Sequence, residues 1–194
     1  MTIEIECTGI SPLLMHSDRA SDPLSKEARW LSELAGKRRK TEADIVELAR
    51  REFHSSLYLD AAGRPTIPID NVHSCIYAAA KRRKEGPAFS GSFTVTSVRF
   101  EYDGPDDPDA LWEQPDNFVD RRSVKVGMSR VIRTRAIFPK WSLAVTAEHD
   151  PEVADLFNIG QWAQIAGTRI GLGDYRPQRG GLFGRFEAKV TDRS

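Results

Sequence analysis

The spacing of apolar residues is the feature that most constrains the fold, because it indicates where strands and helices must lie. Residues 2–7 alternate polar and apolar side chains with a period of two, and residues 92–102 do the same, so both segments predict half-buried strands. Between them, the apolar residues of segment 70–83 recur at helical spacing, with Asp70 or Asn71 as the expected N-cap. The chain therefore mixes strands with helices.

The second half of the chain continues this mixture. Residues 132–138 and 142–147 predict two strands, residues 150–166 predict a helix capped by Asp150, and residues 183–190 predict a last strand. Apart from two excursions, the predicted order is strand, helix, strand, strand, helix, strand. This order is typical of a ferredoxin-like (RRM-like) core, an α+β arrangement in which one face of the sheet stays open.

The first excursion, residues 18–56, reads as a helical insertion. Ser25 or Asp22 is the expected N-cap of its first helix, and Thr41 followed three residues later by Asp44 predicts a capped second helix. Apolar residues of that second helix recur at positions i, i+3, i+4 and i+8, which predicts one buried face. They are Ile45, Leu48, Ala49 and Phe53.

Charge is balanced over the whole chain but segregated along it. Lys and Arg number 28, and Asp and Glu also number 28, which excludes a strongly basic, histone-like protein. Residues 101–120 contain eight acidic residues and no basic one, whereas residues 121–135 contain six basic residues and no acidic one. The six are Arg121, Arg122, Lys125, Arg130, Arg133 and Arg135.

The basic segment 121–135 differs from an ordinary charged surface because its cations alternate with aliphatic residues around Gly127. This pattern predicts either a β-hairpin arm or an irregular loop with cations on one side. Such an arm can lie along phosphates, where each neutralised charge releases a counterion. By contrast, we interpret the basic run 37–40 as a solvated surface, the usual role of a charge run.

A glycine-rich segment, residues 167–186, contains six of the 14 glycines. Glycine permits positive φ and close backbone approach, both of which phosphate-cradling loops require. The P-loop and dinucleotide patterns do not fit, because the segment follows a predicted helix and lacks Gly-Lys-Ser/Thr. Two interpretations stay open: an ordinary turn-rich loop, or a loop that clamps a nucleic-acid backbone through its arginines. Those arginines are Arg169, Arg176, Arg179 and Arg185.

Two segments resemble the repeat-associated mysterious protein (RAMP) superfamily. Residues 66–81, TIPIDNVHSCIYAAAK, resemble the lead-in to its first helix, and residues 180–186, GGLFGRF, resemble its glycine-rich loop before the last strand. The ferredoxin-like order and the long basic excursion are similar to the thumb-bearing backbone subunits of CRISPR effector complexes. Those subunits have an RRM-like core, polymerise along a guide RNA and grip its backbone without reading sequence.

This resemblance implies a single domain over residues 1–194, with a helical insertion at about 18–56 and an acidic and basic excursion at about 103–135. It implies a non-catalytic protein, without a cofactor, that binds RNA or single-stranded DNA as a homo-oligomer or with CRISPR-like effector subunits. The helix at 70–83 would end beside the nucleic acid. The candidate nucleic-acid-binding residues are Arg121, Arg122, Lys125, Arg130, Arg133, Arg135, Arg169, Arg176, Arg179, Arg185, Lys81, Arg82 and Arg83.

Two alternatives remain open. An endoribonuclease of the same superfamily would use a histidine, and His16 after the first strand is the candidate, with Tyr77 and Lys81 to assist it. A structural protein would dock the acidic segment of one copy on the basic segment of the next.

The composition also bears on location and ligands. No apolar stretch approaches the roughly 20 residues that cross a bilayer, and the first residues lack the pattern of a secretory signal, so we expect no membrane partner. Cys7 and Cys75 are the only cysteines, too few for a cysteine zinc site, and they suit the reducing cytoplasm. No pair of metal-ligating residues has a usable spacing, so we expect no metal.

Overall fold

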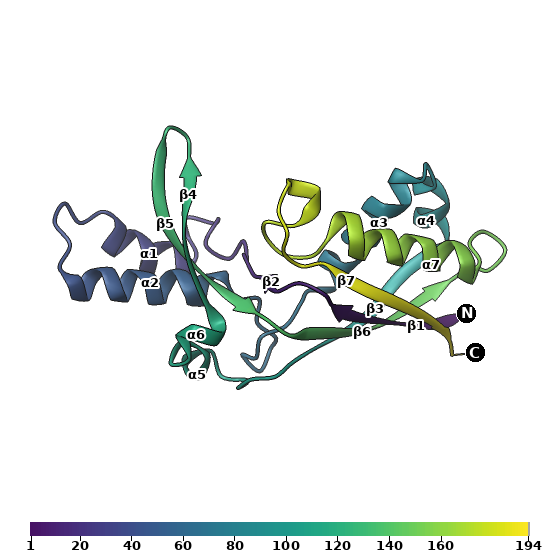
Figure 1. Cartoon of the computed structure of the whole chain (residues 1–194), viewed down its shortest axis with the longest axis horizontal. Coiled ribbons are helices and arrows are strands. Elements are labelled where there is room, and N and C mark those ends of the chain that lie inside the picture. The colour runs from purple at the N-terminus through teal and green to yellow at the C-terminus, as the bar shows by residue number, and fades with distance from the viewer. Residues whose placement is uncertain (194) are drawn as a thin grey trace. The chain divides into compact units, whose positions relative to one another are not determined.

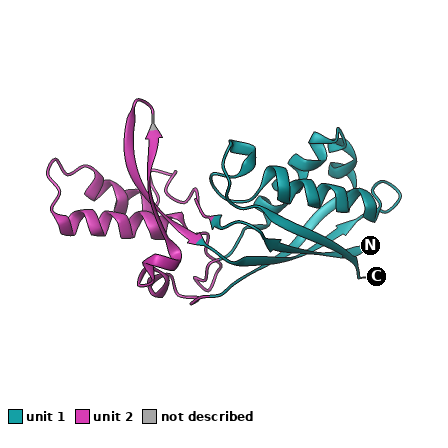
Figure 2. Ribbon diagram, viewed as in Figure 1, with its two compact units in different colours: residues 1–13, 66–103, 138–194 teal, residues 14–65, 104–137 magenta. Residues whose placement is uncertain are grey.

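The protein is an α+β structure with two antiparallel sheets and seven α-helices in residues 1–193, the part of the chain that this computed structural model describes (Figure 1). Its contacts divide it into two compact units (Figure 2). Unit 1 contains residues 1–13, 66–103 and those from 138 onward, and unit 2 contains residues 14–65 and 104–137. The two excursions seen in the sequence thus fold together as unit 2.

Unit 1 is a four-stranded sheet with helices on one face (Figure 1). The strand order is β3-β6-β1-β7, and each strand is antiparallel to its neighbours. Along the chain the elements are β1 (Thr2–Gly9), α3 (Ile69–Arg82), α4 (Gly86–Ser92), β3 (Phe93–Tyr102), β6 (Trp141–His149), α7 (Leu156–Ile165) and β7 (Phe186–Asp192).

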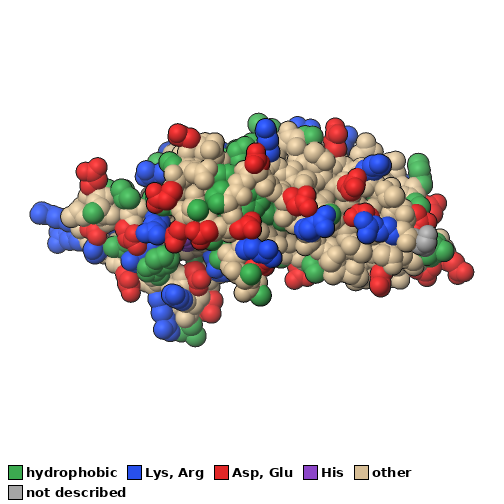
Figure 3. Space-filling view, turned by 90° about the horizontal axis from the view of Figure 1, so that it is seen from below, with side chains coloured by type: hydrophobic (Ala, Val, Ile, Leu, Met, Phe, Trp, Pro, Cys, Tyr) green, Lys and Arg blue, Asp and Glu red, His purple; other side chains and the backbone are tan. Residues whose placement is uncertain are grey.

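The register separates a covered face of this sheet from an open one. Ile3 lies opposite Ala147 and Ile5 opposite Val145, and all four side chains are buried, as the alternation in the sequence predicts. The helices supply the other side of this core through Val72, Ile76, Ala79, Ala80, Ile159 and Trp162. Glu4, opposite Thr146, belongs to the open face. Figure 3 views the molecule from this side, where acidic and basic side chains are mixed.

Unit 2 contains the helices α1 (Lys26–Ala35), α2 (Glu42–Ser56), α5 (Pro108–Trp112) and α6 (Pro115–Phe118). They accompany a sheet in the order β2-β5-β4, made of β2 (Leu13–Leu14), β5 (Ser129–Phe138) and β4 (Val119–Val126). Phe53 on α2 is fully buried and packs against Trp112, with 5.5 Å between ring centroids. Phe53 therefore joins the helical insertion to the acidic part of the second excursion.

The predicted starts of α1 and α2 are correct. Ser25 caps α1 by accepting from the Ala28 amide, and Thr41 with Asp44 forms the predicted capping box of α2. The helix predicted at 70–83 is confirmed as α3, but its predicted N-cap, Asp70 or Asn71, was wrong, because the helix already begins at Ile69 after Pro68, whose side chain has no acceptor.

Three other sequence predictions need correction. The helix α7 begins at Leu156, capped by Asp155, because Asp150 instead closes a turn by accepting from the Ala154 amide. Ile45 on α2 is 47% exposed, so only part of the predicted apolar face is buried. The last strand begins at Phe186, three residues after its predicted start at residue 183. Among residues 1–193, no helix combines the length and apolarity needed to cross a bilayer.

Candidate nucleic-acid interface

The basic segment 121–135 folds as the hairpin β4–β5, the first of the two predicted alternatives. Gly127 and Met128 form the two-residue turn, and Gly127 has φ +58°, the conformation that a tight hairpin turn needs at its first central residue. Met128 is 97% exposed at the tip. Figure 1 shows the hairpin extending past the helices of its own unit.

The strand register divides the six cations between the two faces of the hairpin. Directly opposed residues share a face, and successive residues alternate between faces. Lys125 is opposite Arg130, and Arg121, four residues before Lys125, lies on the same face. We call Arg121, Lys125 and Arg130 the cationic face. The second face carries Arg122, Arg133 and Arg135.

The arginines of the second face are engaged within unit 2. Arg122 forms an ion pair with Asp120, and its Nε also donates to that carboxylate over 2.6 Å. Arg133 donates from Nη1 to Glu52 Oε1 over 2.6 Å. The side chain of Arg135 is half-buried. Carboxylates of unit 2 thus neutralise Arg122 and Arg133, and Arg135 is only partly accessible, so the second face leaves little free charge for a ligand.

Beside the two-residue strand β2, helix α2 covers the edge of β5 that faces away from β4. The Thr134 amide donates to Glu52 Oε2 over 2.9 Å, and the Ala136 amide donates to Ser56 Oγ over 2.8 Å. Glu52 and Ser56 are one helical turn apart, and the two amides are two residues apart along the strand. This match satisfies backbone groups that an open edge would leave unpaired, and it fixes the base of the hairpin to α2.

The cationic face remains open to solvent. Arg121, Lys125 and Arg130 are all exposed, and none has an ion-pair partner among residues 1–193. Ile132, opposite Ser123 on the same face, is 54% exposed. The face thus combines three uncompensated positive charges with aliphatic surface.

The glycine-rich segment forms a loop that folds onto itself in unit 1. The Leu172 amide donates to Gly184 O over 2.9 Å, the Phe183 amide to Tyr175 O over 3.1 Å, and the Gly184 amide to Pro12 O over 2.8 Å. A Cβ on Gly184, which has φ +65°, would lie 1.8 Å from Leu172 O. These amides are therefore occupied by backbone carbonyls of the loop and of Pro12, and the geometry is that of a packed, turn-rich loop.

The arginines of this loop lie in different settings. Arg169, on the π-helical turn η1 (Ala166–Ile170), is exposed, and so is Arg179 in η2 (Pro177–Arg179). Arg176 donates from Nη1 to Gly173 O over 2.8 Å, and Arg185 is half-buried. Two of the four predicted loop arginines, Arg169 and Arg179, are thus exposed.

The basic end of α3 is not gathered with the glycine-rich loop. Cys75 Sγ lies 3.4 Å from Gly171 O at the loop, whereas Arg82 follows Cys75 by seven residues, about 10 Å along the helix axis. Arg83 pairs with Glu85 over 2.9 Å. Lys81 stacks on the Tyr77 ring, with its Nζ 5.5 Å from the centroid. Arg82 is exposed.

The structure adds no support to the endoribonuclease alternative. His16 lies in unit 2, and its backbone carbonyl accepts a hydrogen bond from the Tyr58 hydroxyl over 2.9 Å. Its proposed assistants, Tyr77 and Lys81, belong to unit 1. Within the described part of the chain, no group of three or more His, Cys, Asp or Glu could hold a metal ion.

Sequence reasoning missed a polar cluster on α2. Asp109 from α5 lies 3.0 Å from His54 Nε2 and 2.8 Å from Arg50 Nη2. Burial lowers the pKa of the His54 imidazole, and the nearby carboxylate opposes that shift only in part. The Arg50 guanidinium lowers the pKa of Asp109. The helical spacing of 50 and 54 was visible in the sequence, but their common partner lies more than fifty residues away.

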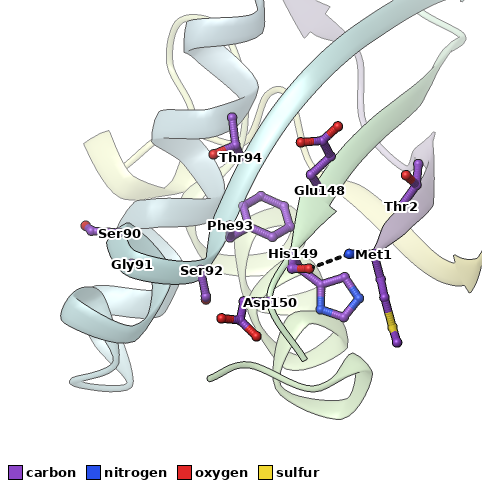
Figure 4. A pocket seen from close by; sticks show the side chains of 10 residues that line it. All are labelled: Met1, Thr2, Ser90, Gly91, Ser92, Phe93, Thr94, Glu148, His149 and Asp150. Atoms are coloured by element: carbon purple, nitrogen blue, oxygen red, sulfur yellow. Dashed lines mark hydrogen bonds between the residues drawn. The ribbon is translucent and has the colours of Figure 1, made fainter. Parts of the chain in front are cut away.

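A polar hollow of about 420 Å³ lies at one end of the unit 1 sheet (Figure 4). The Met1 amino group donates to His149 O over 2.8 Å, and His149 Nδ1 lies 2.9 Å from Ala154 O. Two exposed carboxylates, Glu148 and Asp150, also line the hollow. Their negative charge makes this hollow a poor site for a phosphate.

No protein-family model matches the chain, and the search of curated proteins finds no match.

Proposed function

We propose that this protein binds the backbone of RNA or single-stranded DNA through the cationic face of the β4–β5 hairpin. The observation that carries the proposal is the division of charge across the hairpin. The second face has its arginines paired or half-buried, whereas Arg121, Lys125 and Arg130 are exposed without a carboxylate partner in residues 1–193. Exposed cations on a regular strand pair suit a linear polyanion.

The topology of unit 1 supports a ferredoxin-like assignment. The strand order β3-β6-β1-β7, with α3 and α7 on one face, fits a strand, helix, strand, strand, helix, strand chain order. Under this assignment the hairpin corresponds to the thumb of RAMP-type backbone subunits. Residues on the open face include Glu4, Glu6 and Thr146, and none of its described residues is aromatic. RRM sheets stack bases on aromatic side chains, and the open face here has none among its described residues. The proposal therefore assigns nucleic-acid binding to the hairpin.

Assembly along the nucleic acid is part of the proposal. Copies of the chain line up on the bound strand, as a homo-oligomer or with effector subunits of the same fold. The alternative of head-to-tail docking without nucleic acid is less favoured, because Asp109 and Asp120 of the acidic segment already pair with Arg50 and Arg122. Light scattering with and without a single-stranded 40-mer, on nuclease-treated protein, separates the two: assembly without the strand contradicts the proposal.

The direct test removes the charge of the cationic face. We expect Arg121→Ala/Lys125→Ala/Arg130→Ala to bind a labelled single strand more weakly in fluorescence anisotropy. Losing three phosphate contacts should flatten the slope of the logarithm of the binding constant against the logarithm of salt concentration by about 2, because single strands release about 0.7 ion per contact. At 0.15 M salt, relative to 1 M, this corresponds to an affinity loss of about 50-fold.

The matched control removes the same amount of charge elsewhere. Arg38, Arg39 and Lys140 are exposed and lie outside the hairpin. The variant Arg38→Ala/Arg39→Ala/Lys140→Ala therefore has the same net charge as the test variant, and we expect its salt slope to stay near that of the wild type. Equal losses in the two variants would reduce the proposal to a general effect of net charge.

A further inference from the structure

A second feature of unit 2 has the chemistry of a small binding site. A cavity of about 170 Å³ lies beside α1 and α2. Its volume is well below the roughly 300–1,000 Å³ of pockets that take drug-sized ligands, so its scale suits one ring system. The residues that the argument uses are Arg19, Lys26, Trp30, His54 and Ser55.

The aromatic wall of the cavity is held in place from behind. The Arg51 guanidinium lies 4.8 Å from the centre of the Trp30 ring, and its Nη1 donates to Trp30 O over 2.5 Å. Arg51 Nε is fixed in turn by Glu47 over 2.9 Å. The Trp30 and His54 rings are tilted by 52°, with centroids 6.5 Å apart. A half-buried tryptophan held by these contacts is pre-organised to stack a planar group.

Two buried side-chain polar atoms at the cavity have neither a hydrogen-bond nor an ion-pair partner within residues 1–193, whereas a third atom without a hydrogen bond, His54 Nε2, lies 3.0 Å from Asp109. Ser55 is only 4% exposed, and its Oγ is one of them. The other is Nε of Arg19, whose Nη2 donates to His54 O over 2.6 Å. Unsatisfied buried groups are costly, and a ligand with acceptors and donors on its edge would satisfy both. Two further charges line the cavity: the exposed Lys26, and Glu27, which pairs with Arg19 Nη1 over 3.4 Å.

The cavity adjoins the base of the hairpin along α2. Ser55 follows Glu52 by three residues, so the two side chains are neighbours on the helix surface. Glu52 is the residue that holds Arg133 and the Thr134 amide of β5. The helix that carries the cavity is therefore the same helix that holds the base of the hairpin.

We propose that this cavity binds one unpaired nucleobase of the strand whose backbone the hairpin holds. Trp30 stacks on the base, the Ser55 hydroxyl and Arg19 Nε bond its edge, and Lys26 meets a neighbouring phosphate. The inference rests on the proposed function and narrows its ligand to single strands, because a base in a duplex is already stacked and paired. Burial lowers the pKa of His54, which disfavours a positive charge on its imidazole.

The test compares strands with and without bases. Anisotropy is measured for a labelled 20-nucleotide single strand, an abasic strand of the same length and a duplex, with wild type, Trp30→Leu and Ser55→Ala. We expect Trp30→Leu to bind the base-bearing strand about 5- to 150-fold more weakly, the range for one stacked base. Its affinity for the abasic strand should not change. Ser55→Ala should weaken binding of the base-bearing strand while leaving thermal stability equal or higher, since its hydroxyl has no partner to lose.

The outcomes separate this inference from the function on which it rests. Equal effects of Trp30→Leu on base-bearing and abasic strands, or no effect on either, overturn the base pocket and leave backbone binding intact. Failure of the wild type to bind any strand overturns both. Tight binding of free nucleoside monophosphates, with no added affinity for strands, assigns the cavity to a soluble nucleotide and overturns the inference as stated.

Discussion

Replacing Glu52 tests whether α2 holds the hairpin in the way that the geometry indicates. In Glu52→Ala the Thr134 amide loses its acceptor at 2.9 Å, and Arg133 loses its carboxylate. Thr134 is 2% exposed, so its orphaned amide costs about 1–3 kcal/mol. The Arg133 ion pair adds at most about 1 kcal/mol, because the arginine side chain is 46% exposed and screened by solvent.

Native-state amide hydrogen exchange measures this loss of local stability at single residues. We expect the Thr134 amide to exchange about 5- to 150-fold faster in Glu52→Ala, since 1.4 kcal/mol corresponds to a factor of ten. Glu52→Gln retains an oxygen that can accept from the amide and loses only the ion pair, so its acceleration should stay below about 5-fold.

Ser56→Ala is the matched control for the same edge. It removes the acceptor of the Ala136 amide, which donates to Ser56 Oγ over 2.8 Å, and it should accelerate Ala136 more than Thr134. The opposite selectivity is expected for Glu52→Ala. If Glu52→Ala and Glu52→Gln accelerate Thr134 equally, the carboxylate oxygen is not the acceptor and the reasoning about the covered edge is refuted.

Three further predictions concern stability and reactivity. Gly184→Ala should lower the melting temperature more than Gly180→Ala: both have positive φ, but only at Gly184 would the new Cβ meet a backbone oxygen, whereas nothing lies within 4 Å at Gly180, and equal losses would contradict the clash. Burial places the pKa of His54 in the folded protein below its ordinary value of 6.5, so the unfolded chain takes up the proton first as the pH falls. The contribution of neutral His54 to the free energy of unfolding is therefore complete above pH 6.5 and is lost as the pH falls through the folded pKa. Urea titrations of His54→Gln should show a shallower decline of the free energy of unfolding between pH 7 and 5 than the wild type shows. Burial raises the pKa of Cys7 to about 12 and raises that of Cys75 as well, so neither thiol should react with a disulfide reagent at pH 8 until guanidinium unfolds the chain, and fast labelling of the native protein would contradict the packing.

Local patterns in the sequence were sufficient for much of the fold. The alternation of Ile3 and Ile5 predicted the central strand, and the pair Thr41 and Asp44 predicted the start of α2, because both depend on side chains a few residues apart. Prediction failed at α7, where Asp150 and Asp155 are both plausible caps. The choice between them depends on how the preceding turn closes, which is not a local pattern.

For the candidate interface, the sequence predicted the cations but not which of them are available. The segregation of acidic and basic segments was correct as a pattern, and it led to a β-hairpin with cations on one side as one of two alternatives. The register places cations on both sides instead, and Glu52 and Asp120 neutralise part of the second face. Strand register and long-range ion pairs decide this outcome.

The amino-acid sequence by itself determined the type of each major element and the clustering of charge, because hydrophobic periodicity and capping act over a few residues. Only the tertiary structure decided which cations face solvent, and that the glycine-rich loop uses its amides internally. It also brought Trp30, His54 and Ser55 around one cavity, with Asp109 beside His54. Each of these depends on contacts between residues far apart in the chain, and such contacts exist only once the apolar faces have packed.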